Sequence, residues 1–188
     1  MLCAFVDESC RVRRDDDCLY VLAAVLLPAE ELDQVRSMMD SLRYGKAPTV
    51  HWRTERSARR LLIAQAVASL ECASVVAVSL YGTAGRSERA RRHCLLRLLP
   101  ELSARGVGAV VFESRREQDA GDRAILTALR RGEQIAAEMS VNWERASSDA
   151  ALWTADVVAG VVTGWMGGDQ QWWPLFEDRV TFLEASEA

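Results

Sequence analysis

Three acidic residues of this 188-residue chain stand beside or within apolar segments. Asp7 directly follows the run LCAFV, and Glu113 directly follows the run VGAVVF. Asp156 lies in the stretch LWTADVVAGVV, which carries no other charge. A buried carboxylate is costly in free energy unless it is paired or binds a metal ion. Because hard divalent cations prefer oxygen ligands, the pattern predicts a Mg²⁺ or Mn²⁺ site formed by Asp7, Glu113 and Asp156.

Such a cluster suits phosphodiester cleavage. Two divalent cations about 3.5–4 Å apart stabilise both the attacking and the leaving oxygen of an in-line displacement. Taken singly, the carboxylates also have structural interpretations: a turn cap for Asp7, an ion pair with Arg115 or Arg116 for Glu113, and a core ion pair for Asp156. Their joint placement on three separate core elements favours the metal site.

His51 is a further candidate for catalysis. It lies in a loop segment with polar neighbours, where a histidine can act as a general acid or contact a phosphate. A structural hydrogen bond is an equally good interpretation of this residue. Both interpretations remain open from the sequence alone.

The elements that must position these residues alternate between strands and helices. The hydrophobic patterns predict strands at 2–6, 19–27, 73–81, 107–112 and 138–143, with a hairpin loop at 11–17. They predict helices at 28–43, 57–70, 85–105, 119–134 and 149–166. If residues 29–70 are a helical insertion, the remaining order is that of a ribonuclease H-like α/β fold, a mixed sheet flanked by helices. We therefore expect a single domain of this fold over residues 1–188.

Composition limits the partners of the chain. Its net charge of −4 argues against a domain whose only function is to bind the phosphate backbone of nucleic acid. An enzyme can still contact nucleic acid through a local surface. The arginines at 86, 89, 91, 92 and 97 are predicted to form a solvated helix face. The apolar stretch 150–168 carries Asp156 at its middle, so it predicts a buried helix and no membrane contact.

The cysteine pattern bears on metals and compartment. Five cysteines without a C-x-x-C pair, and only two histidines, argue against a structural zinc site. No signal peptide precedes the first apolar run, so the pattern predicts a reducing, cytoplasmic location. Trp172 and Trp173 are consistent with a homodimer interface and equally with packing of the C-terminal segment on its own core.

Four segments together resemble the family called domain of unknown function 3800. They are the opening AFVDES, the segment TVHW after a predicted helix, the strand end VVFES and the helix LWTADVVAG. Members of that family typically begin with Tyr or Phe, then Ile or Val, then Asp-Glu-Ser-Gly, and carry Ala-Asp-Leu/Val-Ile/Val-Ala-Gly near the C-terminus. The resemblance spans the chain from Cys3 to about Gly164. It implies a ribonuclease H-like fold and metal-dependent nuclease activity.

The resemblance also assigns residues. Asp7 and Glu8 match the acidic pair of the first strand, which makes Glu8 a candidate additional ligand, and Asp156 matches the aspartate of the final helix. Glu113 takes the place of the fourth-strand carboxylate of the broader fold, and His51 matches a histidine that follows an acidic residue in many members. Two positions depart from the family pattern, Val50 before the histidine and Cys10 in place of the usual glycine.

The resulting prediction is a Mg²⁺- or Mn²⁺-dependent nuclease whose substrate is RNA or DNA. A catalytically silent binding or regulatory protein on the same fold is the main alternative, and the acidic net charge favours it. A phosphoryl hydrolase acting on small substrates is the third interpretation, because the same carboxylates would serve its chemistry.

Overall fold

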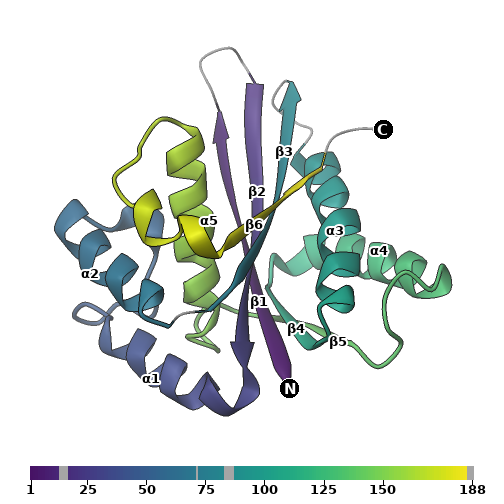
Figure 1. The fold of residues 1–188 in the computed structure, drawn as a ribbon, viewed down its shortest axis with the longest axis horizontal. Coiled ribbons are helices and arrows are strands. Elements are labelled where there is room, and N and C mark those ends of the chain that lie inside the picture. The colour runs from purple at the N-terminus through teal and green to yellow at the C-terminus, as the bar shows by residue number, and fades with distance from the viewer. Residues whose placement is uncertain (13–16, 71, 83–86, 186–188) are drawn as a thin grey trace.

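A mixed sheet of six strands forms the centre of the computed structural model, which describes residues 1–12, 17–70, 72–82 and 87–185 (Figure 1). The strand order is β5-β4-β1-β2-β3-β6. Strands β1, β2 and β3 pair antiparallel in succession, whereas β4 is parallel to β1, β5 to β4 and β6 to β3. The strands are β1 (Leu2–Val12), β2 (Asp17–Pro28), β3 (Ser74–Gly82), β4 (Val107–Glu113), β5 (Ser140–Glu144) and β6 (Val180–Glu184).

Helices cover both faces of this sheet, so its central strands are buried on both sides (Figure 1). One face carries α1 (Leu32–Ser41), α2 (Ser57–Ala68) and α5 (Leu152–Met166). The other carries α3 (Ser87–Ala104) and α4 (Asp119–Arg131). Burial on both faces explains why β2 reads as a continuous apolar run in the sequence.

The alternation of side chains along β1 determines which face each candidate residue meets. Cys3 and Phe5 belong to the core under α5, and Ala4 and Val6 belong to the core under α3. Since successive side chains of a strand point to opposite faces, Asp7 and Glu8 point in opposite directions.

The regular elements of residues 29–70 are all helical, as predicted, although the first predicted helix is shorter. A 3-10 turn, η1 (Ala29–Glu31), precedes α1, which ends at Ser41. Arg36 of α1 forms an ion pair of 2.7 Å with Asp149, whose Oδ1 also accepts the backbone N–H of Ala151 just before α5. This pair ties the helical segment to the start of α5.

The β1–β2 hairpin has a shorter connection than the predicted loop at 11–17. Val12 pairs with Cys18, so Arg11 and Val12 belong to β1 and Asp17 to β2. Residues 13–16 of the predicted loop, and residues 85–86 of the predicted helix 85–105, lie outside the described residues. Strand β1 therefore continues beyond Asp7 to Val12.

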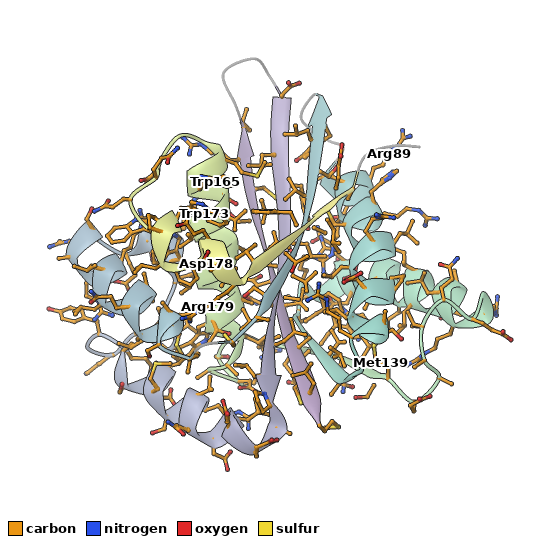
Figure 2. All side chains as sticks on the ribbon, in the orientation of Figure 1. Arg89, Met139, Trp165, Trp173, Asp178 and Arg179 are labelled. Carbon is orange, nitrogen blue, oxygen red and sulfur yellow. The ribbon has the colours of Figure 1, made fainter. Side chains whose placement is uncertain are left out.

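The C-terminal segment forms β6, which the sequence patterns did not predict. After α5, two 3-10 turns, η4 (Trp173–Leu175) and η5 (Glu177–Arg179), lead across the helix to the edge of the sheet (Figure 1). Trp173 stacks on Trp165 with ring centroids 4.3 Å apart, and the two lie side by side in Figure 2. Trp172 is buried in the same chain's core, so this packing gives no support to a homodimer interface. None of the helices in the described part is both long and apolar enough to span a membrane.

Candidate active site

Asp7, Glu113 and Asp156 come together on the face of the sheet that α5 covers. Strands β1 and β4 are parallel neighbours, and Val6 pairs with Phe112. The next residue of each strand, Asp7 and Glu113, therefore lies beside the other. Each carboxylate influences the pKa of the other. Asp156 lies in the second turn of α5, which packs across β1. The structure therefore brings together the three carboxylates that the sequence predicted to form one site.

The electrostatics of the cluster reflect this proximity. Burial raises the pKa of Asp7 well above its ordinary value, and the negative charges of Glu113 and Asp156 raise it further. A hydrogen bond from the backbone N–H of Glu8 to Oδ1 of Asp7, 2.7 Å long, acts against these effects. Burial also raises the pKa of Glu113, with Asp156 adding to the shift and the hydrogen bond to Asp7 opposing it. The carboxylates thus repel one another when no cation is bound.

His51 borders the cluster on its solvent side. Its Nδ1 lies 3.3 Å from Oδ2 of Asp156, and its side chain is 59% exposed. The hydrogen bond to Asp156 raises the pKa of His51 above 6.5, and the charges of Asp156 and Glu113 act in the same direction. An exposed imidazole with a raised pKa can donate a proton or contact an anion near neutral pH.

The turn after His51 is fastened to α5. The backbone N–H of Trp52, the first residue of η2 (Trp52–Thr54), donates a 2.8 Å hydrogen bond to Oδ2 of Asp156. The guanidinium of Arg60 donates to the backbone carbonyls of Trp52 and Arg53, and it lies over the indole ring 5.3 Å from the centroid. Sequence reasoning did not identify Trp52 or Arg60 as supports of this site. The TVHW segment was the only signal that could have pointed to them.

Glu8 lies on the opposite face of the sheet and takes no part in the cluster. It forms an ion pair with Arg91, which is only 2% exposed and also binds Asp122 at 2.6 Å. Tyr20 completes this group through its hydroxyl, 3.2 Å from Nη1 of Arg91. The assignment of Glu8 as an additional ligand therefore does not fit the structure, because period-two alternation points its side chain towards α3 and α4.

Among the described residues, no arginine forms an ion pair with Glu113 or Asp156. Arg115 pairs with Glu88 and Asp122, and its Nε lies 3.8 Å from Glu8, so it does not neutralise Glu113. The predicted solvated arginine face of α3 is wrong at Arg91, because two carboxylates compensate its charge in the interior. Arg86 lies outside the described residues.

The donor set of the cluster suits a hard divalent cation, although no preformed cage is present. Among the described residues, no three histidine, cysteine or acidic side chains surround one common point closely enough to enclose a metal ion. A Mg²⁺ site typically uses only one or two carboxylates, with water and substrate phosphate completing the shell. Asp7 and Glu113 supply two adjacent carboxylates, and their mutual repulsion is what a cation would relieve.

Comparison with known proteins identifies the fold. No protein-family model matches the chain, and no curated protein matches it. Ribonuclease H2 from Pyrococcus horikoshii OT3 is similar in structure with a TM-score of 0.52 and 14% identity, over 92% of this chain and 77% of that chain. Bst-RNase HIII in complex with Mn²⁺ gives a TM-score of 0.49 and 15% identity, over 86% of this chain and 51% of that chain. The chain has a ribonuclease H-like α/β fold, as its element order predicted.

Proposed function

We propose that this protein is a Mg²⁺- or Mn²⁺-dependent nuclease that uses Asp7, Glu113 and Asp156 as metal ligands. The convergence of these three carboxylates on one face of a ribonuclease H-like sheet is the observation that carries the proposal. The raised pKa values of Asp7 and Glu113 support it, because a site that is electrostatically unfavourable alone becomes favourable with a bound cation.

The roles of the residues follow from their positions. Divalent cations in such a site would stabilise the charge that develops on the oxygens of the phosphodiester. Asp7 and Glu113 would hold them from the sheet, and Asp156 from α5. The hydrogen bond from Trp52 fixes the carboxylate of Asp156, and His51 lies where it can donate a proton to a leaving oxygen.

The substrate of the proposed enzyme is nucleic acid, either RNA or DNA. The ribonuclease H2 from Pyrococcus horikoshii OT3 supports this choice by its name and fold. The resemblance to the family called domain of unknown function 3800 supports it through the motifs that contain Asp7 and Asp156, and we include membership of that family in the proposal.

The direct test is cleavage of labelled single-stranded RNA, single-stranded DNA and an RNA–DNA hybrid in Mg²⁺ or Mn²⁺. We expect Asp7→Asn to reduce cleavage by at least about 10²-fold, since it removes charge stabilisation worth several kcal/mol in such sites. Glu8→Gln is the matched control, because Glu8 lies on the opposite face and should leave the metal requirement unchanged. Ca²⁺ should bind but support turnover poorly, owing to its looser coordination.

Equal cleavage by wild type and Asp7→Asn would contradict the proposal and indicate a contaminating nuclease. Absence of both cleavage and metal binding would favour the catalytically silent binding protein. Hydrolysis of small phosphate esters, without cleavage of any polynucleotide, would favour the phosphoryl hydrolase.

A further inference from the structure

A pocket of about 660 Å³ lies beside Asp156 and extends away from the carboxylate cluster between β1 and α5. The end of β1, including Ser9 and Arg11, forms one wall. The middle and C-terminal half of α5 form another, and the turn with Trp52 and Arg53 closes a third side. The size is within the range of ligand-binding sites. The proposed catalytic site does not account for this space.

The face of α5 that lines the pocket is made of small residues. Gly160, Thr163 and Gly164 follow Asp156 at spacings that place all four on one side of the helix. At a rise of 1.5 Å per residue, Thr163 lies about 10 Å along the helix from Asp156, and Gly167 lies about 16 Å from it. The small residues let two large side chains approach the helix, Trp52 at Gly160 and Arg11 at Gly167, and these side chains help to form the pocket wall.

Thr163 has a buried hydroxyl group that lacks a partner. The residue is 6% exposed and lines the pocket, yet its Oγ1 forms no hydrogen bond with any described residue. Buried hydroxyl groups are normally paired, because leaving one unsatisfied is costly in free energy. Many threonines in helices donate their hydroxyl to a backbone carbonyl of the preceding turn, but Thr163 does not. The unpaired hydroxyl points to a polar ligand group in the pocket.

Three arginines give the pocket a positive character that the protein as a whole lacks. The guanidinium of Arg11 lies against Gly167, where an added Cβ would be 2.1 Å from Nη1, so the glycine makes room for it. Within the described residues, neither Arg11 nor the exposed Arg53 forms an ion pair. Arg60 is held by carbonyl groups of the 52–54 turn.

Two aspartates face these arginines. Asp156 belongs to the proposed metal site, so a bound cation would compensate its charge. Asp169 accepts the backbone N–H of Gln171 at 3.1 Å. Guanidinium groups bind phosphate through paired hydrogen bonds, and three of them outnumber the two acidic groups. The residues that line the pocket therefore favour binding of an anion.

We propose that this pocket binds the phosphate backbone of one nucleic-acid strand as it leaves the cleavage site, with Arg11 and Arg53 on phosphates and the Thr163 hydroxyl on a sugar or phosphate oxygen. This inference rests on the proposed nuclease function for its choice of ligand. The volume of about 660 Å³ is that of a site for a small ligand, so we expect it to take a segment of one strand in preference to a duplex.

The test is binding of fluorescein-labelled nine-nucleotide oligothymidylate and oligouridylate, measured by fluorescence anisotropy in Ca²⁺ at several salt concentrations. We expect Arg11→Gln to weaken binding about tenfold and to reduce the slope of log K against log salt by about 0.7, the value for one phosphate contact on a single strand. Thr163→Val should also weaken binding, while the melting temperature stays the same or rises because an unpaired buried hydroxyl is removed. Arg92→Gln, exposed on α3 across the sheet, is the control and should bind like wild type.

Unchanged binding in both Arg11→Gln and Thr163→Val would overturn the inference, even if the protein proves to be a nuclease. A duplex of the same length that shows the same dependence on Arg11 would also overturn it. Arg11-dependent binding of the single strands, without cleavage of any substrate, would support the strand-binding pocket while the nuclease proposal fails. The two proposals are thus separable.

Discussion

The indole ring of Trp52 lies directly against the backbone of Gly160, where a Cβ would be 2.0 Å from Cδ1 of the ring. The backbone N–H of the same tryptophan binds Asp156, one helical turn earlier. One residue therefore fixes the distance between the His51 loop and α5 through its ring, and the orientation of the Asp156 carboxylate through its backbone. This relationship also gives a physical reason for the glycine in the ADVVAG segment.

Gly160→Ala should therefore destabilise the protein by about 1–3 kcal/mol, the usual cost of forcing an extra group into a packed core. The matched control is Gly164→Ala on the same helix, where the nearest atom to the added Cβ is 3.8 Å away. That change should be neutral or stabilising by about 0.4–1 kcal/mol, since alanine has less conformational freedom to lose. Urea unfolding measures both. If Gly160→Ala lost no more stability than Gly164→Ala, the close packing of Trp52 on Gly160 would be contradicted.

Asp7→Asn should stabilise the metal-free protein and abolish its response to metal. Replacing a buried, repelled carboxylate by a neutral amide removes the repulsion from Glu113 and Asp156. Thermal melts with EDTA and with Mg²⁺ test this. Glu8→Gln should lower the melting temperature, because it weakens the partner of Arg91, but should keep the rise caused by Mg²⁺. A strongly destabilised Asp7→Asn variant would instead mark Asp7 as a structural residue.

The pKa values of Asp7 and Glu113 predict the pH dependence of the metal-free protein. Both pKa values are raised in the folded state, so above pH about 4 the native protein binds more protons than the unfolded chain. The stability that they contribute is present at low pH and is lost as pH rises through the raised pKa values. The measurement is the free energy of unfolding of wild type minus that of Asp7→Asn in EDTA, from pH 4 to 8. This difference should fall as pH rises. A difference that increases with pH would show that the pKa of Asp7 is lowered in the folded state and not raised.

His51→Ala should reduce cleavage by about 10²-fold, the lower range for the loss of a general acid, without reducing the stabilisation by Mg²⁺. The raised pKa of His51 predicts that wild-type activity declines as pH rises above 6.5 through that pKa, and that the variant lacks this decline. His93→Ala is the control, since this residue lies on α3 across the sheet. Full activity in His51→Ala would show that His51 has no catalytic role and serves only through its hydrogen bond to Asp156.

Arg91→Met should destabilise the protein by about 3–5 kcal/mol, because it leaves the buried Asp122 and the partly buried Glu8 without their cation. Arg92→Met, one residue further along α3 and exposed, should change stability by less than about 0.5 kcal/mol. Adding Asp122→Asn to Arg91→Met should recover part of the loss. Similar unfolding midpoints for the two arginine variants would show that the buried network contributes little.

The sequence was informative about carboxylates within apolar runs and uninformative about residues whose surroundings come from distant segments. Asp7, Glu113 and Asp156 were identified because a charge in an apolar run is rare, and the structure places all three together. β6 has only five residues, none of them buried and without strict alternation of apolar and polar residues, so no pattern distinguished it from a loop. Arg91 could not be recognised as buried, because its compensating charges come from β1 and α4, far away in the sequence.

The opposite directions of Asp7 and Glu8 make the site sensitive to the number of residues in β1 rather than to their identity. Deleting one residue between Leu2 and Val6, with the start of the strand held by β4, would carry Glu8 to the α5 face. Arg91 would then lose one of its two carboxylate partners, while the longer Glu8 carboxylate would replace Asp7 in the cluster. Among homologous chains we therefore expect apolar substitutions along this strand to be common, and a change in the spacing between its first paired residue and Asp7 to be absent.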